Sequence, residues 1–360
     1  MLALLSVLTF LSTHLLCKTQ LPPSSWKLLF MKPIVYAILL ALPSVCFGQY
    51  TYKNLRVNFL ESPSDARNYT YANLRLYPVY ATDSFKLAFR NVGKYTSLQE
   101  AVQAKKIKIT ERTDGSSVNN LTVQNTSSDT IIIICGDVVK GGQQDRIVQE
   151  DIVLAPKSGK KNLKVFCVES GRWSRVQPEM AVPSDALIVK EDAPAEFNAY
   201  YSKGTMSLRK VVDKEKDQEK VWSKVEEINS KNKTETATST YTAISNSGSF
   251  TKTLDSYLKY FSTKFSDPNI IGLVVVSGNK VLGCDLFATN ALFKGQLQSL
   301  LHSYATEAIL NGAPVTASAQ TVRNYLDRLL KDENVQKQTL KQKGSAFVHE
   351  GKKLRVSSYD

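Results

Sequence analysis

Apolar residues in the first part of the chain either alternate with polar ones or form short unbroken runs, and both patterns predict β-strands. The clearest run is Ile131 to Ile134. Four isoleucines are too few for a buried helix, and their β-branched side chains favour a strand buried on both faces. The other segments with strand character are residues 52–60, 74–80, 106–111, 121–123, 152–154 and 163–168. Ser97 and Glu100 have capping-box spacing and predict one short helix that ends near Ala104.

From about Met206 onward the apolar positions recur mainly with the period of a helix. The predicted helices cover residues 208–228, 254–261, 291–310 and 321–331. Two pairs of strand-like runs with turn residues between them predict hairpins, at residues 271–286 and 345–357. Residues 213–220 are wholly polar, which predicts an exposed stretch of the first helix, laced with ion pairs between residues four apart.

These patterns predict an α+β protein with an antiparallel, β-rich N-terminal half and a helix-rich α+β C-terminal half. Residues 230–249 are rich in Ser, Thr and Asn, which predicts a flexible connector or a long loop. The chain is therefore divided into a β-rich part, residues 49–229, this connector, and an α+β part, residues 250–360. We expect the last part to pack on the first as one unit.

The N-terminal region contains a predicted secretion signal that starts at an internal methionine. Met31 and Lys32 give a positive start, residues 34–42 form an uncharged apolar run, and small residues precede a predicted cleavage site after Gly48. The signal, residues 31–48, predicts a secreted or periplasmic protein whose first residue is Gln49. The apolar run is shorter than the roughly 20 residues of a membrane helix, so no stable span is expected after cleavage.

Residues 1–30 fit this signal poorly, because they begin with a second apolar run that has no charge before Lys18. Their simplest explanation is a mis-assigned start, with Met31 as the true first residue. The alternative is an extension of the leader, or a membrane anchor, ahead of Lys18.

The chain is basic, with a formal net charge of +13, and its hydrophobic content of 42% is ordinary for a globular protein. The lysines are dispersed and mostly interleaved with acids, as expected for a solvated surface. The alternative is an anionic partner, such as a membrane surface, a polyanionic glycan or a phosphate ligand. No nucleic-acid partner is expected, because the charge is not gathered into a stripe and the protein carries a secretion signal. The oligomeric state stays open.

Three cysteines remain after the predicted cleavage: Cys135, Cys167 and Cys284. A Cys135–Cys167 disulfide and a pair of buried thiols are both compatible with their positions at the ends of strand-like runs. The sequence has no CxxC, HExxH or GxSxG motif, so no zinc ribbon, thioredoxin-type centre, zincin or serine-hydrolase elbow is expected. We predict no metal and no cofactor.

Polar residues that could grip a ligand follow the isoleucine run. Gly141 and Gly142 can adopt positive φ, and their amides could form a concavity for an anion. Arg146 offers a rigid fork for a phosphate or carboxylate, and Gln143 or Gln144 could hydrogen-bond a sugar hydroxyl. The alternative is a hairpin turn in which Asp145 and Arg146 pair or brace the loop.

A second polar group ends the strand-like run 163–168. Glu169 could act as an acid, a base or an acceptor for a sugar hydroxyl, and the nearby Trp173 could stack on a ring. The alternative is a buried ion pair of Glu169 with Arg172 or Arg146, capped by Trp173. Because strands join the two groups, we expect them to be neighbours in space.

A third acid lies within an apolar strand. Burying the charged side chain of Asp285 there costs free energy unless it is paired or functional, or unless it faces water at a sheet edge. The candidate catalytic residues are thus Asp145, Glu169 and Asp285, and the candidate ligand-binding residues are Gly141, Gly142, Gln143, Gln144, Arg146, Arg172 and Trp173. If the protein is an enzyme, carboxylates and arginines must act, and Asp137 joins that set.

Three motifs together resemble one poorly characterised family. They are G-D-V-V-K-G-G-Q-Q-D-R at 136–146, C-V-E-S-G-R-W at 167–173 and G-C-D-L-F at 283–287. The sequence is similar here to the ADP-ribosylglycohydrolase and rhodanese-phosphatase-superfamily-associated protein domain family, over roughly residues 73–311. The resemblance brings no established activity. At most it implies an association with nucleotide or ADP-ribose chemistry.

The leading functional hypothesis is binding of a small-molecule or glycan ligand, bearing a sugar or a phosphate, at the two loops. One alternative is a carboxylate-dependent hydrolase at the same loops, and another is a structural or interaction protein of the cell envelope. Buried, paired carboxylates would favour the structural alternative, whereas an open cleft with two carboxylates about 5–9 Å apart would favour a glycosidase-like hydrolase.

Overall fold

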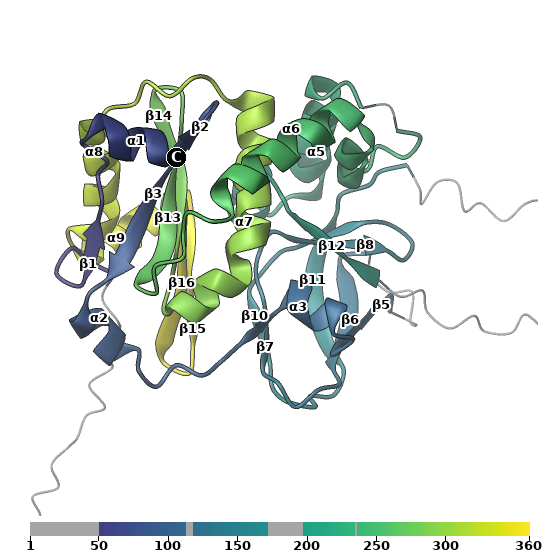
Figure 1. Cartoon of the computed structure of the whole chain (residues 1–360). Coiled ribbons are helices and arrows are strands. Elements are labelled where there is room, and N and C mark those ends of the chain that lie inside the picture. The colour runs from purple at the N-terminus through teal and green to yellow at the C-terminus, as the bar shows by residue number, and fades with distance from the viewer. Residues whose placement is uncertain (1–49, 113–117, 172–196, 235) are drawn as a thin grey trace, which may run out of the picture. The chain divides into compact units, whose positions relative to one another are not determined.

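The largest sheet joins strands from both ends of the part of the chain that the computed structural model describes, which is residues 50–112, 118–171, 197–234 and 236–360 (Figure 1). Its strand order is β1-β3-β13-β14-β16-β15, with β2 added beside β3, and every pairing is antiparallel. The strands are β1 (Leu55–Val57), β2 (Thr70–Tyr71), β3 (Leu74–Ala81), β13 (Ile270–Ser277), β14 (Lys280–Phe287), β15 (Gly344–His349) and β16 (Lys352–Tyr359).

The middle of the chain forms two smaller sheets. The six-stranded sheet has the antiparallel order β12-β8-β9-β11-β6-β5, and the three-stranded sheet has the order β10-β7-β4, in which β4 and β7 are parallel. The strands are β4 (Thr96–Ser97), β5 (Ile107–Thr110), β6 (Asn120–Asn125), β7 (Ile131–Ile133), β8 (Asp137–Gly141), β9 (Arg146–Val148), β10 (Ile152–Leu154), β11 (Lys161–Cys167) and β12 (Phe197–Lys203).

The isoleucine run lies between two hydrophobic cores. Ile132 and Ile134 belong to the large core under the seven-stranded sheet, whereas Ile131 and Ile133 belong to the smaller core of the middle sheets. Because side chains alternate along a strand, one strand can serve both cores only if both of its faces are apolar. The prediction of a strand buried on both faces is confirmed.

Helices cover both faces of the seven-stranded sheet. Helices α8 and α9 lie against one face, and α7 with α6 lies against the other, as Figure 1 shows. The long helices are α5 (Gln218–Lys231), α6 (Gly248–Phe261), α7 (Asn290–Asn311), α8 (Ala319–Leu330) and α9 (Glu333–Lys343). The short ones are α1 (Pro63–Asn68), α2 (Asp83–Ala88), α3 (Leu98–Gln103), α4 (Met206–Lys210), the π-helical turn η2 (Val211–Glu215) and the 3₁₀ helix η3 (Tyr241–Asn246). The α+β fold class is confirmed.

Several elements were predicted correctly from short sequence motifs. The capping box closes α3, since Ser97 Oγ accepts the Glu100 N–H and the Glu100 carboxylate accepts the Ser97 N–H. The hairpins β13–β14 and β15–β16 form where they were predicted. Helix α9 and the strands β8 and β9 were not predicted as separate elements.

The single helix predicted over residues 208–228 is wrong. Lys216, with φ of 52°, ends the π turn, and Asp217 starts α5 by accepting the Lys220 N–H. The polar middle is also not fully exposed, because Asp213 is 8% exposed. The sequence periodicity did not indicate that Asp213 would be buried.

The predicted connector, residues 230–249, contains the 3₁₀ helix η3, whose Tyr241, Thr242 and Ile244 are buried. The largest sheet takes strands from both sides of this stretch. The described residues belong to one compact unit, while the division of the chain at the connector stays a prediction. No helix in the described ranges is long and apolar enough to cross a lipid bilayer.

Candidate functional site

The loop between β8 and β9 is a tight hairpin that the two glycines make possible. Gly141 has φ of 126° and Gly142 has φ of 54°, a region that side chains disfavour. A Cβ on Gly142 would lie 2.3 Å from the Phe197 ring and 2.7 Å from Glu111 Oε1. The close packing that glycine allows at position 142 is therefore with the side chains of Phe197 and Glu111.

Asp145 is the centre of this loop and is fully buried. Its Oδ1 accepts the Gly141 N–H at 3.1 Å, and its Oδ2 accepts the hydroxyls of Thr240 at 2.7 Å and Thr242 at 2.6 Å. Both threonines lie at the start of η3, so this carboxylate ties the β8–β9 loop to a segment nearly one hundred residues later.

The loop after β11 meets the β8–β9 loop directly, as predicted. Glu169 is 1% exposed, and its Oε2 accepts the Asp145 N–H at 3.0 Å. The Gln144 amide donates to the Glu169 carbonyl at 2.7 Å, and the Val168 N–H donates to the Asp145 carbonyl at 3.0 Å. We call this set, Gln144, Asp145, Arg146, Glu169, Thr240 and Thr242, the loop cluster.

Arg146 is also fully buried, and its partner was not foreseen. Its Nε donates to the Val118 carbonyl at 3.2 Å, and its Nη2 lies 3.6 Å from Glu111 Oε1. Among the described residues this Nη2 has no hydrogen bond. Glu111 ends the strand predicted over 106–111, and nothing in its local sequence indicated that it would face Arg146.

The exposed part of the loop is small. Gln143 is exposed, and its N–H donates to Glu111 at 2.9 Å. Arg172 and Trp173 lie outside the described residues. The described loop residues are therefore mostly buried and bonded to one another, with Gln143 facing the solvent.

Asp285 belongs to a different cluster. Strand β14 is an inner strand, between β13 and β16, and Asp285 is 1% exposed, so the water-facing edge position is wrong. Its carboxylate accepts two hydrogen bonds from Arg209, at 3.0 and 2.5 Å, one from the Tyr304 hydroxyl at 2.6 Å, and one from the Ser357 hydroxyl.

Further buried pairs surround this group. Arg355 donates two hydrogen bonds to Asp151, at 2.7 and 3.2 Å, and Lys203 is bonded to Asp137. We call Asp137, Asp151, Lys203, Arg209, Asp285, Tyr304, Arg355 and Ser357 the central cluster. Its three cations face three carboxylates, which offsets part of the cost of burying charge.

The pKa values in the central cluster show how strongly these charges interact. Burial alone would raise the pKa of Asp285, but the charge and hydrogen bonds of Arg209, with those of Ser357 and Tyr304, outweigh burial and hold the pKa well below its usual range. Burial lowers the pKa of Lys203, and the neighbouring Asp137 opposes that shift in part. Perturbed groups of this kind are found both at functional sites and in structural networks.

A cavity of about 310 Å³ lies beside the central cluster. Its wall includes Tyr359, whose ring lies against the Arg209 guanidinium at 5.5 Å, and three lysines, Lys210, Lys224 and Lys280. The sequence did not indicate this cavity, because its lining comes from α4, η2, α5, α7, β14 and β16.

The cysteines of the described chain are free and buried, so Cys135 and Cys167 are thiols and the disulfide alternative is wrong. Burial raises the pKa of the Cys284 thiol to about 12, which keeps it protonated. Burial lowers the pKa of His302 to about 4. In the described ranges no three His, Cys, Asp or Glu side chains are grouped so as to hold a metal ion.

Comparison with known proteins identifies the family. The model of the ARG and Rhodanese-Phosphatase-superfamily-associated Protein domain matches residues 65–360, so the chain belongs to this family. The match includes both polar loops and Asp285. No curated protein and no solved structure matches the chain.

Proposed function

We propose that this is an exported protein that acts by binding rather than by hydrolysis, and that the loop cluster holds its fold together. One observation carries the proposal: the candidate catalytic carboxylates of Asp145, Glu169 and Asp285 are between 0% and 1% exposed. Each already accepts hydrogen bonds from the protein.

A catalytic acid or base must come within hydrogen-bond distance of the substrate, directly or through one water. The Asp145 carboxylate is occupied by one backbone N–H and two hydroxyls, and that of Asp285 by a buried arginine. Freeing either group would leave buried donors without partners, at a cost of roughly 1–3 kcal/mol for each neutral one. This cost favours a structural role.

Export is supported by the way Tyr50, the first described residue, is held in the fold. Tyr50 is fully buried, its hydroxyl donates to the Lys353 carbonyl at 3.0 Å, and its carbonyl accepts from the Gln336 amide at 2.9 Å. The predicted cleavage site after Gly48 lies just ahead of this anchored residue. Cleavage there would leave the described fold whole, in a secreted or periplasmic protein.

A ligand could also bind at the loops, because Arg146 Nη2 has no hydrogen bond among the described residues. A ligand with sugar or phosphate groups, including ADP-ribose as the family resemblance implies, could use this cation only if the loop opened. A role for the loops as a hydrolase site has less support, since it also needs a carboxylate to reach the substrate.

A thermal-shift experiment separates these functions. The purified protein, Asp145→Asn and Arg146→Ala are melted alone and with ADP-ribose, nucleotides, sugars and phosphorylated glycans. Binding to the native state raises the melting temperature by mass action. The proposal expects both variants to melt at lower temperature without ligand. A variant that keeps its melting temperature and loses a ligand-induced shift would instead place the ligand at the loops.

A further inference from the structure

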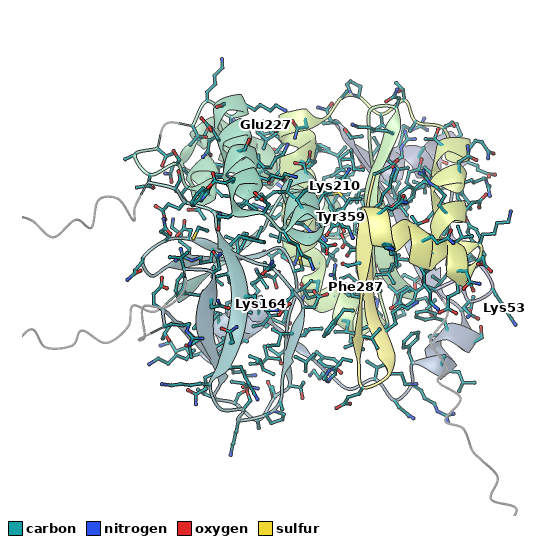
Figure 2. All side chains as sticks on the ribbon, turned by 180° about the vertical axis from the view of Figure 1, so that it is seen from behind. Lys53, Lys164, Lys210, Glu227, Phe287 and Tyr359 are labelled. Carbon is teal, nitrogen blue, oxygen red and sulfur yellow. The ribbon has the colours of Figure 1, made fainter. Side chains whose placement is uncertain are left out.

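The cavity beside the central cluster is built from segments that are far apart in sequence. Met206, Ser207 and Lys210 come from α4, Lys224 from α5, Glu307 from α7, Lys280 from the start of β14 and Tyr359 from the end of β16. Lys210 and Tyr359 are labelled near the centre of the face shown in Figure 2. Its volume of about 310 Å³ is in the range of small-molecule sites.

Three lysines line this cavity. Lys280 is exposed, and its side chain makes no hydrogen bond or ion pair with any described residue. Lys210 donates to a main-chain oxygen of Asp360, the last residue of the sequence, at 3.1 Å, and Lys224 pairs with Glu227, which does not line the cavity. The ammonium group of Lys280 has no carboxylate partner among the described side chains. Such groups bind phosphate as point charges.

The acids that line the cavity are matched differently. Glu215 pairs with Lys220, and the Asp360 side chain pairs with Lys343 at 2.5 Å. Neither of these lysines lines the cavity, so the charges of both acids are balanced by cations that are not part of its wall. The remaining acid is Glu307.

Glu307 is 5% exposed and accepts two hydrogen bonds, from the Ser207 N–H at 2.9 Å and from the Asn311 amide at 2.8 Å. Both donors are neutral, and no cation pairs with this carboxylate among the described residues. A carboxylate oxygen has two acceptor positions, so each oxygen of Glu307 can take a further donor. A ligand hydroxyl is a suitable donor.

From this arrangement we propose that the cavity binds a small phosphorylated polyol, of the sugar-phosphate class. The lysines Lys210, Lys224 and Lys280 hold the phosphate, and Glu307 accepts hydrogen bonds from the hydroxyl groups. A free inorganic phosphate fits less well, because it would gain the lysines but place a second anion near Glu307. A neutral sugar would leave the lysine charges unused.

This inference goes beyond the proposed function, which gives the loop cluster a structural role and assigns no ligand to the cavity. The loop cluster can hold the fold while the cavity stays empty, and the cavity can bind while the loops do something else. The two proposals are tested on different residues, so either can fail alone.

Isothermal titration calorimetry of the purified protein tests the proposal with glucose 6-phosphate, ribose 5-phosphate, glucose and inorganic phosphate. The sugar phosphates are expected to bind more tightly than either glucose or inorganic phosphate. Lys280→Gln should weaken sugar-phosphate binding about tenfold, the loss of one charge-assisted hydrogen bond. Lys53→Gln is the matched control, because Lys53 is exposed and far from Lys210 in Figure 2, and it should change nothing.

Glu307→Gln tests the polyol half of the ligand. It should reduce the preference for a sugar phosphate over inorganic phosphate about tenfold, since a carboxylate acceptor is replaced by an amide. Its melting temperature is measured in parallel, because the Ser207 N–H and Asn311 lose a charged partner. The proposal is overturned if no sugar phosphate binds, if Lys280→Gln and Lys53→Gln behave alike, or if inorganic phosphate binds as tightly as the sugar phosphates.

Discussion

Arg209 on α4 and Asp285 on β14 form a two-point ion pair, with hydrogen bonds of 3.0 and 2.5 Å, and both side chains are at most 1% exposed. The pair joins the seven-stranded sheet to the helical segment that leads on to α5. The Arg209 side chain also passes beside Gly136, where a Cβ would lie 2.7 Å from its Cγ. Because neither partner can reach water, each of the two buried charges depends on the other for its stabilisation.

Breaking this pair should be costly, and removing both partners should cost less than the sum. Arg209→Met alone, or Asp285→Asn alone, leaves one buried charge without its partner, which typically costs 3–5 kcal/mol. The double variant should be less destabilised than the two single effects added, by at least about 1 kcal/mol. Urea unfolding of the four proteins measures this coupling. Additive effects would mean that the pair does not act as a unit.

Gly142 should tolerate no side chain. Gly142→Ala places a Cβ against the Phe197 ring in a left-handed conformation that itself costs roughly 1–2 kcal/mol, so the unfolding free energy should fall by at least about that amount. Gly159→Ala is the matched control, because a Cβ there meets nothing within 4 Å. It should be neutral or stabilising by up to about 1 kcal/mol. Equal effects of the two substitutions in chemical denaturation would contradict the tight hairpin.

The hydroxyl of Thr242 should contribute to the stability of the fold in addition to the packing of its side chain. Thr242→Val removes one of the hydrogen bonds to the buried Asp145 carboxylate and should cost about 1.5–3 kcal/mol. Thr253→Val makes the same chemical change on an exposed position of α6, where the effect should stay within about 0.5 kcal/mol. Differential scanning calorimetry of both variants measures the contrast. A Thr242 variant as stable as its control would remove the support for the loop cluster.

His302 should make stability fall on mild acidification. Burial lowers its pKa in the folded state to about 4, while the unfolded chain titrates near 6.5. The unfolded state therefore takes up a proton first, and stability that is complete above about pH 6.5 is lost as the pH falls toward 4. The loss is on the order of 1–3 kcal/mol. His302→Gln should flatten the unfolding free energy between pH 7 and pH 4.5, and an unchanged slope would show that other groups cause the fall.

Sequence patterns predicted the elements whose causes are local. The four isoleucines gave a strand buried on both faces, and the spacing of Ser97 and Glu100 gave the capped helix α3. Both depend on residues within a few positions of one another. The adjacency of the two polar loops was also predicted, because strand-like runs join them in the sequence, and β9 and β11 pair in one sheet.

The features that the sequence patterns did not predict depend mainly on residues that are distant in the chain. Asp285 reads as an acid in an apolar strand, but its partner Arg209 lies 76 residues away. Thr240 and Thr242 lie in a stretch that composition favours as a connector, yet both hydroxyls are bonded to Asp145. The break at Lys216 comes from one left-handed residue in a polar run, which periodicity cannot detect. The pattern of polar residues therefore predicted where the loop cluster lies in the chain, but it did not predict that the cluster is buried.

The most direct test of the account measures two properties of two variants: the free energy of unfolding and the affinity for glucose 6-phosphate, in Asp145→Asn and Lys280→Gln. We expect Asp145→Asn to lose at least about 2 kcal/mol of stability while the folded protein keeps its affinity. We expect Lys280→Gln to keep its stability and to lose about tenfold in affinity. The opposite result, a stable Asp145 variant that no longer binds beside a Lys280 variant that still does, would place the ligand at the loops and contradict the account.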